Sequence, residues 1–131
     1  MFVAEWRSAG RSGLPGRIAI VDDDPEQQFL YPEFLLFAQL FRRFGVEAVV
    51  LDPAALSFAG GVLRDSTGPI DLVYNRLTDF SLEAPAHAAL REAYLARAAV
   101  VTPHPRAHAI YADKRNLGLL TDAARLRAWG V

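Results

Sequence analysis

The chain has 131 residues, of which 52% are hydrophobic and 22% are charged, and its formal net charge is -1. This length suits one domain with a single core, and the composition excludes an intrinsically disordered chain. The small net charge argues against bulk nucleic-acid binding, and the absence of cysteine excludes disulfides and thiolate chemistry. No apolar run is long enough to cross a membrane and no secretory signal begins the chain, so we expect a cytoplasmic protein.

The first half of the sequence predicts a β-α-β unit. Residues 1–16 are rich in glycine and proline and are expected to form a loosely held N-terminal arm, although its aromatic residues can dock. Residues 17–21 form a short continuous apolar run, which is typical of a strand buried on both faces. Phenylalanines recur at helical spacing over residues 31–44, and residues 46–52 form a second apolar run. This order predicts parallel strands joined by a right-handed crossover.

The second half continues the alternation of strands and helices. Its predicted elements are a small hairpin at 56–64, a strand at 70–74, a helix at 83–98, a strand at 99–102, and a helical segment from 106 to 131 that is broken near Asp113 or Gly118. Such alternation is typical of an open, doubly wound sheet. We therefore predict a Rossmann-like α/β fold, a three-layer α/β/α sandwich of about four parallel strands with a β-hairpin insertion.

Three aspartates follow the first predicted strand, at the end where open parallel sheets bind ligands. Two interpretations of Asp22, Asp23 and Asp24 remain open. In the first, they are the polar end of a buried strand, and Asp24 with Pro25 forms a turn that caps the next helix. In the second, one of them lines a substrate cleft and receives an amino group.

The same aspartates are typical of a signalling receiver domain, which also needs a phosphoacceptor aspartate after its third strand. Here that strand ends in Asn75, and an amide is a poor phosphoryl acceptor. Lys114 follows Thr102 too closely to leave room for the helix and fifth strand that precede the receiver lysine. A degenerate receiver-like domain therefore belongs to the alternative hypothesis, that of a stand-alone binding or dimerisation module.

Three later segments resemble one enzyme family in their order. They are IDLVYNR at 70–76, AYLARAAVVTPHP at 93–105 and ADKRNLGLLTD at 112–122. Over residues 17–122 the chain resembles the N-terminal substrate domain, called pre-ATP-grasp, of glutathione-synthetase-like ATP-grasp ligases. These enzymes join a carboxylate to an amine or thiol through an acylphosphate. The resemblance implies a small α/β domain at 17–112, and a helix at 113–131 that leads into an ATP-grasp domain.

The resemblance also implies roles for individual residues. Asn75 and Arg76 would bind a carboxylate or amino-acid-like substrate, because an arginine holds a carboxylate by two parallel hydrogen bonds. Asp22, Asp23 and Thr102 would line the same site. Lys114 would bind the nucleotide phosphates as the cofactor-binding residue. ATP and Mg²⁺ are implied only for an intact enzyme, and no catalytic residue or metal ligand is predicted in this chain.

The remaining parts of an ATP-grasp enzyme do not fit between Lys114 and Val131. We therefore expect a fragment that does not catalyse ligation alone. Leu126 and Trp129 are expected to form an apolar patch, covered by the missing domain or by a second copy in a homodimer. No nucleic-acid or membrane partner is expected.

Simpler structural roles compete with these assignments. Arg76 can form an ion pair with Asp79 or another surface acid, and Lys114 can be a solvated helix residue. His104 and His108 are four residues apart but lack a third ligand for a metal. His87 is expected at the surface or edge of its helix.

Overall fold

Strand β1 (Arg17–Val21) lies at the centre of the computed structural model, which describes residues 1–131. All five of its residues are buried, as a strand covered on both faces requires. It pairs in parallel with β2 (Glu47–Leu51) and with β5 (Leu72–Asn75), and β5 pairs with β6 (Val100–Thr102). The resulting four-stranded parallel sheet has the order β2-β1-β5-β6, which confirms the predicted fold class.

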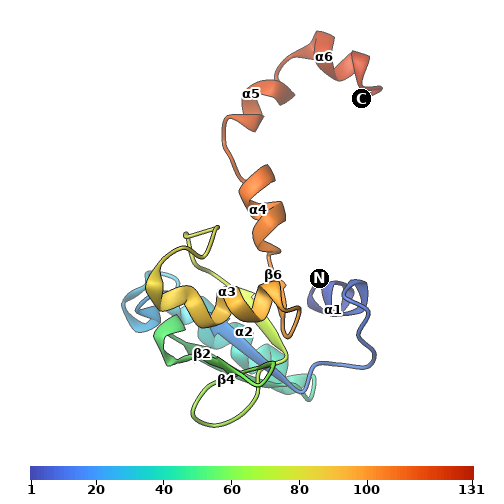
Figure 1. Ribbon diagram of the computed structural model, residues 1–131. Coiled ribbons are helices and arrows are strands. Elements are labelled where there is room, and N and C mark those ends of the chain that lie inside the picture. Colours follow the sequence, from blue (N-terminus) through green and yellow to red (C-terminus); the bar gives the residue numbers. More distant parts are fainter.

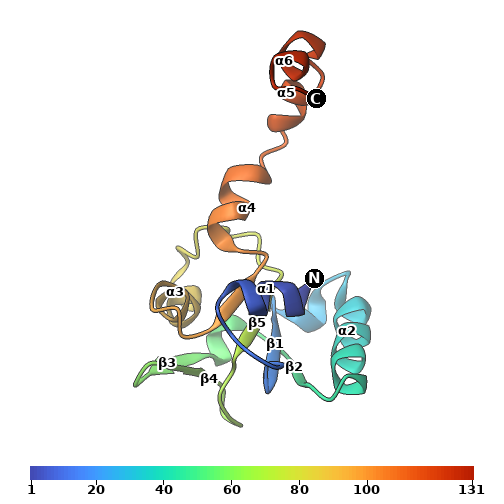
Figure 2. The same ribbon diagram turned by 90° about the vertical axis from the view of Figure 1, so that its right-hand side faces the viewer.

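Helices α2 (Tyr31–Arg43) and α1 (Phe2–Ser8) cover one face of this sheet (Figure 2). The apolar stripe of α2 buries Phe34, Ala38 and Phe41 against the strands, as the helical spacing predicts. Residues 2–8 are not a loose arm, because they form a helix whose Trp6 is buried in the same core.

The opposite face is covered by α3 (Ala88–Leu95) and by the hairpin of β3 (Ser57–Ala59) and β4 (Val62–Arg64). Two short 3-10 turns, η2 (Pro53–Ala55) and η3 (Pro85–His87), precede the hairpin and α3. The helix predicted at 83–98 is thus shorter than expected. The three-layer arrangement with a hairpin insertion is confirmed.

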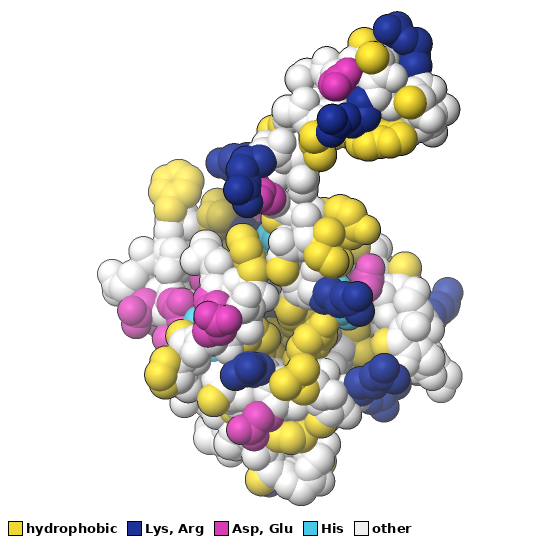
Figure 3. All heavy atoms as spheres, turned by 45° about the horizontal axis from the view of Figure 1, so that its top comes forward, with side chains coloured by type: hydrophobic (Ala, Val, Ile, Leu, Met, Phe, Trp, Pro, Cys, Tyr) yellow, Lys and Arg dark blue, Asp and Glu magenta, His cyan; other side chains and the backbone are white.

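The last segment, residues 105–131, is called here the C-terminal extension and projects from the body (Figure 1). It contains α4 (Pro105–Tyr111), α5 (Asn116–Leu120) and α6 (Ala123–Ala128). Its base contacts the body where the rings of His108 and Phe80 lie 3.8 Å apart. Figure 3 shows apolar side chains exposed along it; they include Ile110, Tyr111, Leu117, Leu120, Trp129 and Val131.

No helix in the structure combines the length and apolar character that crossing a membrane requires.

A buried ion pair holds the amino end of β1. Both Nη atoms of Arg17 donate to the Asp65 carboxylate, at 2.7 and 2.9 Å. Asp65 also accepts hydrogen bonds from the backbone N–H groups of Thr67 and Gly68. These contacts, with the Arg17 bonds first among them, hold the pKa of Asp65 well below its usual range. The pair ties the loop after the hairpin to the central strand.

We predict that Asp65→Asn lowers the free energy of unfolding by about 3–5 kcal/mol, because it leaves the Arg17 charge buried without its partner. The control is Glu47→Gln, since the Glu47 carboxylate lies 2.9 Å from Arg17 Nε but its side chain is 67% exposed. The Glu47→Gln substitution should lower the free energy of unfolding by less than about 1 kcal/mol. Urea unfolding at neutral pH measures both.

The pH dependence has a defined sign. A carboxylate with a lowered pKa stabilises the fold above its ordinary pKa of 3.8, and this contribution is lost as the pH falls through the lowered value. Equal losses of unfolding free energy for Asp65→Asn and Glu47→Gln would contradict the structural role of Asp65.

Candidate functional site

The strands are added to the sheet on opposite sides of β1. After β1 the chain forms β2 on one side, and it then crosses back to form β5 on the other side. Val21 lies opposite Asn75 in the register, and the Arg76 N–H donates to the Val21 carbonyl at 2.8 Å. Asp22 and Arg76 therefore leave the sheet at the same point. In open α/β sheets this crossover is where ligands bind.

The Arg76 side chain packs over two aromatic rings beside this crossover. Its guanidinium carbon is 5.6 Å from the centre of the Phe34 ring and 5.4 Å from that of Tyr74. Its Nη1 donates to the Tyr74 hydroxyl at 3.0 Å, and its Nη2 lies 3.8 Å from the Glu33 carboxylate. The acid facing Arg76 is thus Glu33 and not Asp79. The Arg76 Nε has no hydrogen-bond partner but is buried. At 3.8 Å from Glu33, Nη2 makes no hydrogen bond, so the outer end of the guanidinium retains donors that the fold does not use.

Asn75 and Thr102 lie at the same edge of the sheet but are buried, at 4% and 3% exposure. The Asn75 Oδ1 accepts a hydrogen bond from the Leu77 N–H at 3.1 Å, so it shapes the turn after β5. Thr102 lies opposite Tyr74 in the register and precedes a cis peptide bond to Pro103. Both side chains are therefore largely covered at this edge of the sheet.

Asp22 and Asp23 form the acidic side of the site. Asp22 is partly buried, and burial raises the pKa of its carboxyl group in spite of the hydrogen bond from the Asp23 N–H and the nearby Arg76 charge. Asp23 is exposed and receives a different partner, because its Oδ1 lies 2.9 Å from His87 Nε2.

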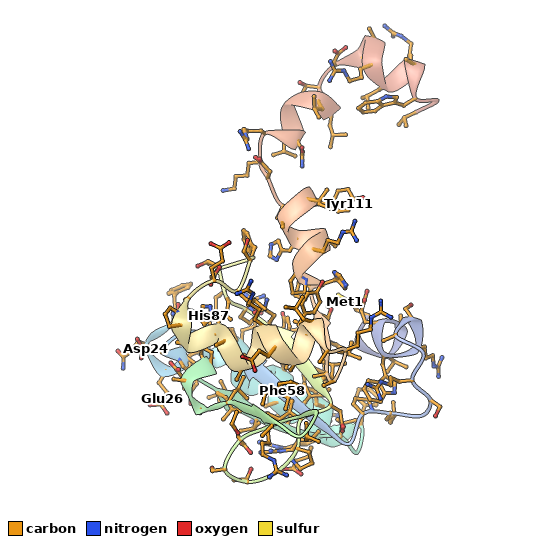
Figure 4. All side chains as sticks on the ribbon, viewed as in Figure 1. Met1, Asp24, Glu26, Phe58, His87 and Tyr111 are labelled. Carbon is orange, nitrogen blue, oxygen red and sulfur yellow. The ribbon has the colours of Figure 1, made fainter.

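His87 bridges two carboxylates. Its Nδ1 lies 2.8 Å from Asp79 Oδ2, and its Nε2 contacts Asp23, a residue 64 positions away. Burial opposes the charge of the ring, but the two hydrogen bonds outweigh it and raise the pKa of His87. Figure 4 shows His87 at the same end of the body as Asp24.

The expectation that His87 lies at the surface or edge is wrong, since it is 2% exposed. No sequence signal identified its partners, because Asp23 approaches only in the folded chain.

The expectation that Asp24 caps the next helix is also wrong. Asp24 has a φ of 42° and precedes the 3-10 turn η1 (Pro25–Gln27), and its side chain makes no capping bond. Its backbone N–H instead donates to Asp52 Oδ2 at 2.9 Å. The side chain that caps a turn here is that of Asp52, because its Oδ1 accepts a hydrogen bond from the Ala54 N–H at the start of η2. Asp24 and Asp52 thus join the ends of β1 and β2.

Lys114 lies in the C-terminal extension, between α4 and α5, and is exposed. Its neighbours Asp113 and Arg115 bond to each other, with Arg115 Nε donating to Asp113 at 2.7 Å. Because Arg115 pairs with Asp113, these two neighbours do not form a phosphate site with Lys114. The residues around Lys114 therefore do not fit a nucleotide on their own.

Histidine and acidic side chains do not gather at a metal centre. No group of three or more such side chains is arranged to hold a metal ion. His104 faces the Tyr94 hydroxyl, and His108 stacks on Phe80.

Comparison with models of known protein families and with curated proteins finds no match to this chain. The similarity to a pre-ATP-grasp domain therefore stays a prediction from the residues themselves.

We predict that His87→Gln destabilises the fold by about 1–3 kcal/mol at mildly acidic pH, because it removes a buried cation held by two carboxylates. A raised histidine pKa gives stability that is fully present below the ordinary value of 6.5 and is lost as the pH rises through the raised value. The difference between wild type and variant should therefore shrink with increasing pH. Urea unfolding across this range measures it.

The matched control is His104→Gln, because His104 is exposed and its contacts are with the hydroxyl and ring of Tyr94, not with a carboxylate. It should change the stability little at any pH. A difference for His87→Gln that grows as the pH rises would contradict the charged bridge.

Proposed function

We propose that the chain is a substrate-binding α/β domain, and that the carboxyl edge between β1 and β5 binds a small amino-acid-like carboxylate. The observation that supports this proposal most is the position of Arg76, which lies beside Asp22 at the crossover with its Nη2 donors not used in a hydrogen bond. The partial exposure of this arginine suits a binding role, since 27% of its side chain remains accessible.

The charges at this edge match the two ends of an amino acid. Arg76 is held over two rings, so its planar fork is fixed before a carboxylate arrives. Asp22 and Asp23 leave β1 beside it and offer carboxylate oxygens to an ammonium group. A ligand with both groups would satisfy both signs of charge, whereas a simple monocarboxylate would use only Arg76.

The wider proposal places this domain in an ATP-grasp-type carboxylate–amine ligase, and it rests on the resemblance stated above. The order of motifs supports it, because β5 ends in Asn75, α3 follows, and β6 runs into Pro103. Lys114 would approach the nucleotide only if a further domain were joined, so we do not propose ligation by this chain alone. ATP would supply the activating phosphoryl group in that joined enzyme.

The second candidate is a stand-alone binding or dimerisation module. The apolar side chains exposed along the C-terminal extension favour it, because any protein surface can bury them and a catalytic domain is not required. A receiver-like module would in addition bind Mg²⁺ near Asp22 and Asp23, which a calorimetric titration with Mg²⁺ alone would detect.

We predict that L-glutamate binds the wild-type chain and that Arg76→Met weakens this binding at least about tenfold, because a charge-assisted fork is lost. Arg76→Lys should restore only part of the affinity, since an ammonium cannot pair in two parallel bonds. Isothermal titration calorimetry with glutamate, and with acetate for comparison, measures these differences.

The matched control is Arg91→Met, on the exposed face of α3, which should leave glutamate binding unchanged. Circular dichroism verifies that each variant is folded. Equal losses for the variants at Arg76 and Arg91, or no binding at millimolar glutamate, would contradict the proposed site.

A further inference from the structure

The outer face of α2 carries large apolar side chains that no other element covers. Leu36, Leu40 and Phe44 are 65%, 42% and 71% exposed. They follow one another at intervals of four residues and so form one stripe along the helix. Figure 2 shows α2 at the side of the body with no element outside it. Such a stripe on a helix is the mark of an interaction surface.

Charged residues of opposite sign stand at the two ends of this stripe. Glu33 lies in the first turn of α2 and Arg43 in its last turn. Together with Leu36, Leu40 and their neighbours, they line a shallow groove of about 320 Å³. The Glu33 side chain is 40% exposed, and Arg43 takes part in no intramolecular ion pair. Both charges are thus accessible to a partner.

The spacing of these four residues is symmetric about Ala38. Glu33 and Arg43 are equally far from it along the chain, and so are Leu36 and Leu40. Two copies of α2 that run antiparallel would therefore place each Glu33 near the partner's Arg43, and each Leu36 near the partner's Leu40. A parallel arrangement would place like charges together, which is unfavourable. The pattern is complementary to itself in one orientation only.

We propose that the outer face of α2 is the interface of a twofold homodimer in which two copies of this helix pack antiparallel. An interface of this kind uses the same patch on both subunits, which is what the symmetric pattern provides. The apolar surface continues past Leu40 and Phe44 into a groove of about 250 Å³ that Met1 and Leu14 also line. This continuity enlarges the contact beyond the helix itself.

The interface does not depend on the proposed ligand site. Glu33 is the one residue that links the dimer interface to the ligand site. Its carboxylate lies 3.8 Å from Arg76, which is long for an ion pair. The contact is built on one helix face and a shallow groove, so we expect a dimer of micromolar affinity or weaker. The wild-type chain should change from monomer to dimer between micromolar and millimolar concentration.

The test is sedimentation velocity of the full chain across that range. Leu40→Glu should abolish the dimer, because it brings two charges into an apolar contact. Arg43→Glu should weaken it about tenfold, because it sets Glu33 against a second acid in both symmetric pairs. The Glu33→Arg variant should behave in the same way. A mixture of the two charge variants should form a heterodimer, because both of its pairs regain opposite charges.

The matched control is Trp129→Ser in the C-terminal extension, which should leave the dimer intact. Circular dichroism of each variant shows whether the fold is kept; because Leu40 and Arg43 are on the surface, their variants suffice if Glu33→Arg does not fold. A chain that stays monomeric at millimolar concentration would overturn the proposal. So would a dimer that survives Leu40→Glu and Arg43→Glu but is lost with Trp129→Ser. Charge variants that fold and do not associate when mixed would overturn the antiparallel pairing.

Discussion

Strand β1 is buried on both faces, and this burial determines how the other elements are arranged around it. Its five residues are apolar or, at Arg17, neutralised by a buried partner, so each face of the strand needs a covering layer. Alternate residues serve the two layers: Ile18 and Ile20 face α2, whereas Ala19 and Val21 face α3 and the hairpin. Parallel neighbours on both sides then bring the carboxyl ends of three strands to one edge.

The same alternation explains how the charges at that edge are separated. Tyr74 belongs to the core under α2, and Arg76, two residues on, points to the same side and lies over the Tyr74 and Phe34 rings. His87 enters from the opposite layer, at the start of α3, and reaches Asp23 there. The aspartates after β1 thus stand between Arg76 and His87, which come from the two sides of the sheet. This separation of charge is what makes the edge suited to a ligand with both an acidic and a basic group.

Local patterns predicted much of this fold. Continuous apolar runs identified the strands, and the phenylalanine spacing identified α2. Their order also predicted that Asp22 and Arg76 would meet at one edge of the sheet. Docking of the aromatic residues in the N-terminal arm was left open, but the helix that carries Trp6 was not predicted. The pairing of Arg17 with Asp65 was not predicted either, because it depends on contacts between distant segments. For the same reason His87 was placed wrongly: an alanine-rich helix start looks exposed until Asp23 and Asp79 are brought to it.

The proposed function depends on binding of an amino-acid-like carboxylate at the edge between β1 and β5. The most direct measurement is a titration of the isotope-labelled chain with L-glutamate, followed by the shifts of its backbone amide signals in NMR spectra. We expect the signals of residues 22–24 and 75–77 to shift together and saturate, while those of the C-terminal extension stay in place. Shifts that centre on the groove along β6, around Tyr94 and His104, or that never saturate, would contradict the proposed function.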